Sequence, residues 1–186
     1  MKHIAPDKGT LLVSEPSIIG DDSFSRSVIL LTESNKEGVV GFILNKLLNC
    51  TLDQLIPEIN LQLEVYQGGP VETDNLYFLH NIPDLIPGSL LIEDGIYWGG
   101  DFDAVSDLLK KGTITSGEIK FFLGYSGWER QQLEEELNSN SWVVVENTDS
   151  KNLLSNSMQD IWKKKMKHLG GNYELWSNAP ENPSSN

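Results

Sequence analysis

The sequence predicts an α+β fold: a single compact domain built on a large mixed β-sheet with about four helices packed around it. A chain of 186 residues suits one domain. Apolar runs of strand length dominate its first two thirds, and about eight strands are expected. Strands and helices do not alternate regularly, which argues against a doubly wound parallel sheet. The domain is assigned to residues 1–177, and residues 178–186 are assigned to a polar C-terminal tail.

The strands are expected where Val, Ile, Leu and aromatic residues cluster. Residues 11–14 form a first short apolar run. Residues 27–32 are apolar without polar alternation, as in a strand that is covered on both faces. A polar loop ending at Gly38 then leads into a return strand over residues 39–45. The remaining strands are expected at residues 63–67, 75–80, 89–92, 96–98, 119–125 and 142–146.

The helices are expected where a capping residue precedes an apolar stripe. Thr51 and Gln54 form a capping box for a short helix that Pro57 ends. Residues 101–111 carry an apolar stripe, and Gly112 follows them as a typical residue after a helix C-terminus. The other two helices are expected at residues 129–138 and 158–169.

Composition excludes several classes of protein. The 14 Lys and Arg residues are outnumbered by 27 Asp and Glu residues, and the net charge of −13 opposes direct binding to nucleic acid or anionic lipid. No apolar run approaches the ~20 residues needed to span a bilayer, and the N-terminus lacks the apolar core of a signal peptide. Cys50 is the single cysteine, so no disulfide framework forms within the chain. We expect a cytoplasmic protein with no membrane anchor, metal or cofactor.

Glycine-rich segments follow three of the expected strands. Glycine allows positive φ angles and close approach of another backbone, so these segments either cradle a ligand or form tight turns that pack densely. The second interpretation is favoured, because the phosphate-binding patterns G-x-x-x-x-G-K-[ST] and G-x-G-x-x-G are absent and acidic residues surround the glycines. The segments are Gly68-Gly69-Pro70, Gly99-Gly100-Asp101 and Gly124-Tyr125-Ser126-Gly127.

The candidates for catalysis all have simpler structural explanations. Ser126 occupies a predicted turn from a strand into a helix, where hydrolases place a nucleophile, but the glycine spacing departs from G-x-S-x-G. A capping box formed with Glu129 explains the serine without a catalytic role, and this interpretation is favoured. His80 ends an apolar strand, where a hydrogen-bonded structural histidine is favoured over a general base.

The two arginines and the lysine cluster near the C-terminus also have structural and functional interpretations. Arg26 opens the first long strand and forms either a structural ion pair, which is favoured, or an anion-binding group. Arg130 is surrounded by glutamates and is expected to pair with them at the surface. The lysines at 163–165 and 167 are interpreted as the solvated face of the last helix rather than as a nucleic-acid site.

Several segments together carry a resemblance to a known family: 26–31, 41–46, 68–71, 94–102, 121–128 with 132–134, Trp162, and 169–171. Their order closely resembles that of the bacterial AlgH/YqgE family, and the match covers about residues 9–186. The resemblance implies a compact α+β domain on a large mixed sheet. The family is often labelled a transcriptional regulator, but the resemblance carries over no catalytic residue, cofactor or DNA-binding element.

Two hypotheses for function follow. The favoured one is a non-enzymatic regulatory or interaction protein that contacts a protein or small ligand, because catalytic signatures are missing and aromatic residues flank the glycines. The alternative is a small-molecule-binding protein or enzyme with an atypical site at the strand-end loops. That alternative predicts that at least three of the following candidates share one pocket. The candidates are Arg26, Asn45, Glu72, Asp94, Trp98, Asp101 and Tyr125.

Overall fold

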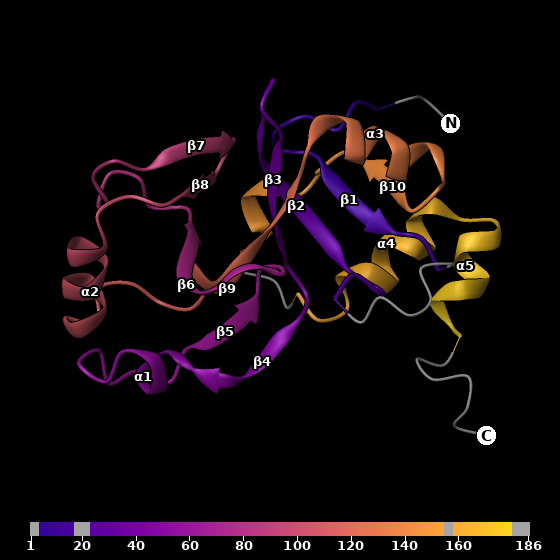
Figure 1. Ribbon diagram of the computed structural model, residues 1–186. Helices are drawn as coiled ribbons and strands as arrows, with labels where there is room; N and C mark the ends of the chain where they lie inside the picture. Colours follow the sequence, from indigo (N-terminus) through magenta and orange to yellow (C-terminus); the bar gives the residue numbers. More distant parts are fainter. Residues whose placement is uncertain (1–3, 17–22, 155–157, 180–186) are drawn as a thin grey trace.

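A single large sheet forms the centre of the fold (Figure 1). The computed structural model describes residues 4–16, 23–154 and 158–179, and ten strands of the sheet lie within them. The strands are β1 (Leu11–Ser14), β2 (Val28–Ser34), β3 (Val39–Ile43), β4 (Leu47–Thr51), β5 (Glu64–Gln67), β6 (Val71–His80), β7 (Leu90–Glu93), β8 (Ile96–Trp98), β9 (Ile119–Trp128) and β10 (Trp142–Val145).

The sheet is mixed, as predicted. Its main order is β10-β1-β2-β3-β9-β6-β8-β7. All strand pairs are antiparallel except β5 with β9, whose parallel register aligns Val65 with Phe121. β9 therefore pairs with β3, β5 and β6 and is the strand that joins the two halves of the sheet.

Five α-helices lie in the described part of the chain. They are α1 (Leu52–Leu55), α2 (Phe102–Lys110), α3 (Arg130–Asn138), α4 (Ile161–Leu169) and α5 (Asn172–Ser177). The capping box predicted for α1 is present, since the Thr51 amide donates to Gln54 Oε1 at 3.1 Å. Asp101 caps α2 by accepting the amide of Asp103 at 2.9 Å. The predictions of these helices are confirmed, while the strand β4 and the helix α5 were not predicted.

The prediction of a turn at residues 124–127 is wrong, because β9 continues through this segment to Trp128. Gly41 of β3 pairs with Ser126, and Val71 of β6 pairs with Tyr125, so the segment is held between two neighbouring strands. The helix α3 consequently begins after Glu129 as N-cap, and Ser126 does not cap it. Part of the predicted tail, residues 180–186, lies outside the described residues.

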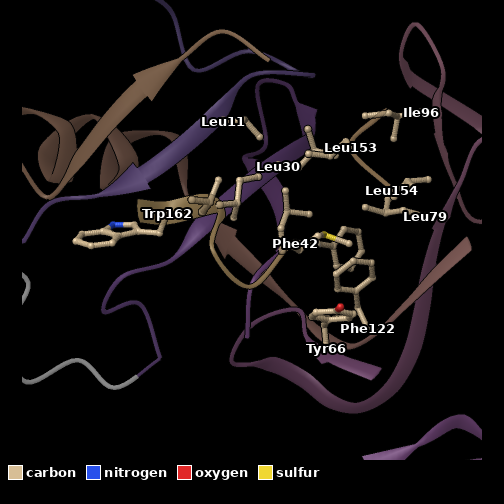
Figure 2. Close-up of a cluster of buried hydrophobic side chains, with 14 of the residues drawn as sticks. Leu11, Leu30, Phe42, Tyr66, Leu79, Ile96, Phe122, Leu153, Leu154 and Trp162 are labelled. Carbon is tan, nitrogen blue, oxygen red and sulfur yellow. The ribbon is translucent and has the colours of Figure 1, made fainter. Parts of the chain in front are cut away.

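Helices cover both faces of the sheet, and the apolar residues separate into three clusters. Leu30 of β2 belongs to the largest cluster, which α4 covers, whereas its neighbours Ile29 and Leu31 face α3. This arrangement explains why residues 27–32 show no polar alternation. A third cluster lies between α1, α2 and strands β5, β6 and β9. In the largest cluster the Phe122 ring packs against Phe42 and Tyr66, with centroid distances of 5.3 and 5.9 Å (Figure 2). Among the described residues, none of the helices has the length and apolar character needed to cross a bilayer.

Candidate functional site

Two of the predicted site residues, Arg26 and Asn45, line one polar pocket of about 590 Å³. Four separate parts of the chain form its walls: the segment before β2, the segment after β3, the start of α4, and the residues that follow α5. We call it the Arg26 pocket. The residues that carry the argument below are Arg26, Asn45, Lys46, Asp160, Trp162, Lys163 and Ala179.

The backbone of Arg26 adopts a left-handed conformation with φ of 52°. Such a conformation costs a non-glycine residue about 1–2 kcal/mol. The carboxamide of Asn45 holds this segment in place, because its Nδ2 donates to the Arg26 carbonyl at 2.8 Å and its Oδ1 accepts the Val28 amide at 2.9 Å. Asn45 therefore acts as a clamp that determines where the Arg26 side chain leaves the backbone.

The guanidinium of Arg26 lies over the indole of Trp162, 5.1 Å from the ring centroid. Its Nη2 donates to the carbonyl of Ala179 at 2.9 Å. Trp162 is only 4% exposed, and its Nε1 donates to the Ser14 carbonyl at 3.0 Å, so the aromatic platform is itself fixed. The structure thus holds Arg26 by stacking and by a carbonyl, in a planar geometry that suits recognition of an oxyanion.

The Arg26 pocket is locally cationic on a protein whose net charge is −13. Among its described lining residues, Arg26, Lys46 and Lys163 are basic and Asp160 is acidic. Asp160 is the N-cap residue of α4, but its side chain makes no capping hydrogen bond, and the positive end of the helix dipole lies beside the pocket. These charges favour a small anion.

Three other candidates, Glu72, Trp98 and Tyr125, lie at a group of aromatic side chains that packs against the largest core cluster. The Tyr77 hydroxyl donates to the carboxylate of Glu72, and this bond lowers the pKa of Glu72 below its usual value. The Tyr77 ring meets Tyr125 edge to face, with centroids 5.8 Å apart, and the Trp98 ring lies 6.2 Å from that of Phe42. These contacts give Glu72, Trp98 and Tyr125 structural partners outside the Arg26 pocket.

The last two candidates have separate structural roles. Asp94 forms an exposed ion pair with Lys151 at 2.8 Å, and Asp101 is the cap of α2. Of the seven candidates, Arg26 and Asn45 line the Arg26 pocket, fewer than the three that the alternative hypothesis required.

Two of the glycine-rich segments, residues 68–70 and 124–127, pack against each other. A Cβ atom on Gly68 would lie 2.1 Å from the Gly124 carbonyl oxygen, and one on Gly69 would lie 2.2 Å from the Tyr125 carbonyl. Ser126 is fully buried in β9, and its hydroxyl donates to the Gly68 carbonyl at 3.1 Å. Dense packing is therefore observed at segments 68–70 and 124–127, whereas a Cβ atom on Gly99 would have no neighbour within 4 Å. Ser126 lacks the exposed position of a nucleophile elbow.

His80 is a buried structural residue. Its Nδ1 accepts the Ile82 amide at 3.3 Å, which assigns the proton to Nε2, the nitrogen 3.1 Å from both the Gly99 carbonyl and the Ser89 hydroxyl. Burial lowers the pKa of the imidazole, with the Gly99 carbonyl acting in the opposite direction. His80 therefore ties the strand end to two loops as a neutral side chain.

Sequence reasoning missed the contributions of Lys46, Trp162, Lys163 and Ala179 to the site. Trp162 was named only as part of the family resemblance, while Lys163 was assigned to a solvated face. Lys46 had an available signal, since it adjoins Asn45 in a segment that carries the family resemblance. Ala179 contributes a backbone carbonyl, which no side-chain pattern predicts.

A one-domain α+β protein with a large mixed sheet and a cationic polar pocket is thus defined, and comparisons identify its family. A family model described as AlgH-like matches residues 11–174. A UPF0301 protein of Bacteroides fragilis is 39% identical over 186 residues, which cover 99% of this chain and 93% of that protein. A UPF0301 protein of Cytophaga hutchinsonii is 38% identical over 181 residues, covering 96% and 98%. The chain belongs to the AlgH-like, or UPF0301, family.

Solved structures share the fold. The solution structure of the AlgH protein from Pseudomonas aeruginosa matches with a TM-score of 0.72 and 26% identity, covering 98% of this chain and all of that one (100%). The crystal structure of a Corynebacterium diphtheriae protein matches with a TM-score of 0.76 and 22% identity, covering 96% of this chain and 95% of the other. The fold class predicted from the sequence is confirmed.

Proposed function

We propose that this AlgH-like protein is a non-enzymatic regulatory protein that binds a small anionic ligand in the Arg26 pocket. The observation that carries the proposal is the convergence of Arg26, Lys46 and Lys163 on one polar pocket. Three of the segments that carry the family resemblance supply Arg26, the Asn45-Lys46 pair and Trp162 to its walls. Arg26 is also held in a left-handed conformation, and backbone strain of this kind concentrates at functional sites.

The regulatory part of the proposal follows from the labelling of the family and from the structural roles that Ser126 and His80 already have. Direct contact with nucleic acid remains opposed by the net charge of −13, so we expect regulation to act through the ligand or a protein partner. We expect the protein to act in the cytoplasm. At Gly68, Gly69 and Gly124 the neighbouring backbone fills the space that a ligand would need, so no observation favours an enzymatic site there.

The proposal is tested by measuring anion binding to the full chain by thermal shift and calorimetry, with inorganic phosphate, sulfate, acetate and citrate as probes. Binding of at least one anion should raise the melting temperature, because a ligand specific for the native state stabilises it. Arg26→Gln should weaken that binding by about tenfold or more, as expected for loss of a charge-assisted hydrogen bond.

Arg130→Gln is the matched control, because Arg130 is exposed and, like Arg26, donates to a backbone carbonyl, that of Asn35, at 2.9 Å. This control should bind the anion as the unmodified protein does. If none of the probes binds, or if the two arginine variants lose affinity equally, the proposed function is rejected.

A further inference from the structure

A second pocket lies against α4 and is formed by different residues from those of the Arg26 pocket. It has a volume of about 240 Å³, which is below the ~300 Å³ at which pockets for drug-sized ligands begin. Its apolar residues are Leu153, Met158 and Ile161, which are 6%, 1% and 9% exposed and belong to the largest core cluster. We call it the α4 pocket.

Basic side chains surround this apolar floor. Lys164, Lys165 and His168 line the α4 pocket, and their spacing places them with Ile161 on one face of the helix. Asp149 is the acid that faces them from the segment after β10. The lysine segment, predicted to be a solvated face, is therefore divided: Lys163 lines the Arg26 pocket, and Lys164 and Lys165 line this one.

Lys165 is half-buried beside the apolar floor. Burial lowers the pKa of its ammonium group, and the charge of Asp149 acts in the opposite direction. A partly desolvated ammonium group gains more from an anionic partner than an exposed one does, because less water screens the pair. The position of Lys165 thus favours a ligand whose charged group meets the rim while its body covers the floor.

Asn147 provides a further polar group in the wall. It lines the α4 pocket, is 7% exposed, and its Nδ2 has no hydrogen-bond partner among the described residues. Its carboxamide lies near Glu93 and lowers the pKa of that carboxyl, against the larger raising effect of burial. Glu93 Oε2 likewise has no hydrogen-bond partner at ordinary distance in the described part of the chain. Asn147 Nδ2 has almost no accessible surface and interacts with Glu93, so Asn147 forms part of the wall and is not one of the groups that meet a ligand.

We propose that the α4 pocket binds a small carboxylic acid with an apolar body, such as an aryl or short-chain acid, whose carboxylate meets Lys165 and Lys164. The apolar floor selects against inorganic anions, which would leave it uncovered, and the cationic rim selects against neutral apolar molecules. The volume limits the ligand to a few carbon atoms beyond a single ring. This inference does not depend on the ligand of the Arg26 pocket, because the two pockets share no lining residue.

The test is an NMR titration of the full chain with benzoate, compared with benzyl alcohol and inorganic phosphate. Benzoate should bind with a dissociation constant on the order of 1 mM, as suits a ligand of so few atoms. It should shift the resonances of residues that line the α4 pocket alone, namely Leu153, Ile161, Lys164, Lys165 and His168. Benzyl alcohol and phosphate should cause smaller shifts there. Similar binding of benzoate and benzyl alcohol would contradict recognition of the carboxylate by Lys164 and Lys165. Absence of benzoate binding would reject the site.

Lys165→Met keeps the length and apolar stem of the side chain but removes its charge, and it should weaken benzoate binding by about tenfold. Lys167→Met is the matched control, since Lys167 is exposed on the same helix and does not line the pocket. Equal loss in both variants would contradict the proposal. Benzoate that bound in the Arg26 pocket would instead shift Asn45, Lys46 and Lys163, so a failure of this site and a failure of the proposed function give different results.

Discussion

Trp128 and Trp142 lie edge to face, with ring centroids 5.9 Å apart and an interplanar angle of 90°, and both indoles donate to the same carboxylate oxygen. That oxygen is Oε2 of Glu136, at 2.9 Å from Trp128 and 2.7 Å from Trp142. One glutamate of α3 thereby ties the ends of β9 and β10 to the helix that covers them. A charged acceptor shared by two buried indoles is a strong local constraint.

Glu136→Gln should destabilise the protein by about 1–2 kcal/mol, because both indoles lose a charge-assisted acceptor. Chemical denaturation followed by tryptophan fluorescence measures this change. Glu134→Gln removes the same charge from an exposed position of the same helix and should change stability by less than about 0.5 kcal/mol. Equal effects of the two substitutions would show that the shared acceptor contributes nothing specific.

The left-handed backbone of Arg26 predicts that glycine is better tolerated there than alanine. Both Arg26→Gly and Arg26→Ala remove the guanidinium, but only alanine retains the strain of a φ of 52°. The glycine variant should therefore be more stable by about 1 kcal/mol. The neighbouring pair Ser25→Gly and Ser25→Ala is the control, because Ser25 does not have a positive φ, and there alanine should be the more stable variant. Unfolding in urea distinguishes these orders.

Gly68→Ala should prevent stable folding or cost more than about 3 kcal/mol, since overpacking against backbone cannot be relieved by a side-chain rotation. The added Cβ would lie 2.1 Å from the Gly124 carbonyl oxygen. Gly117→Ala is a suitable comparison, because its nearest neighbour would be the Thr115 hydroxyl at 3.7 Å. Far-ultraviolet circular dichroism and thermal melts of the two variants test the difference, and a native-like melt of Gly68→Ala would contradict the close crossing of the two strands.

Burial of His80 predicts a loss of stability in mild acid. The folded-state pKa of the imidazole lies below its ordinary value of 6.5, so the unfolded chain binds the proton first as pH falls. Above about pH 7 the protonation of His80 does not change the free energy of unfolding. From pH 6.5 down to the folded-state pKa it lowers the free energy of unfolding progressively, by at most about 1.4 kcal/mol per pH unit.

Denaturation at pH 7.5, 6.5 and 5.5 measures this slope, and His80→Gln should reduce it. His168→Gln, at an exposed position, should retain it. Glu93 acts in the opposite sense, because burial raises the pKa of its carboxyl and protonation then stabilises the fold as pH falls from that raised value. The difference in pH slope between His80→Gln and His168→Gln therefore isolates the effect of His80 from that of Glu93. An unchanged slope in His80→Gln would contradict the assignment.

Local patterns were sufficient for much of the fold. The run at residues 27–32 predicted a strand covered on both faces, and β2 has that position because neighbouring residues face α4 and α3 in turn. The capping box at Thr51 and the helix that begins near Asp101 were also predicted, since each depends on residues within about one helical turn. The family resemblance came from the order of such segments.

The site was decided by contacts between distant parts of the chain. Asn45 and Arg26 were both candidates, but their clamp, the stacking of Arg26 on Trp162 and its bond to Ala179 join segments separated by up to 153 residues. The segment at 124–127 looked like a turn because glycines usually end strands, and it became part of β9 because β3 and β6 supply its hydrogen bonds. The sequence alone therefore determined the class of fold, the family and most local elements, which depend on neighbouring residues. Tertiary structure alone decided the pockets, because their walls come from distant segments that meet only after the strands have paired and each side chain lies on one face of the sheet.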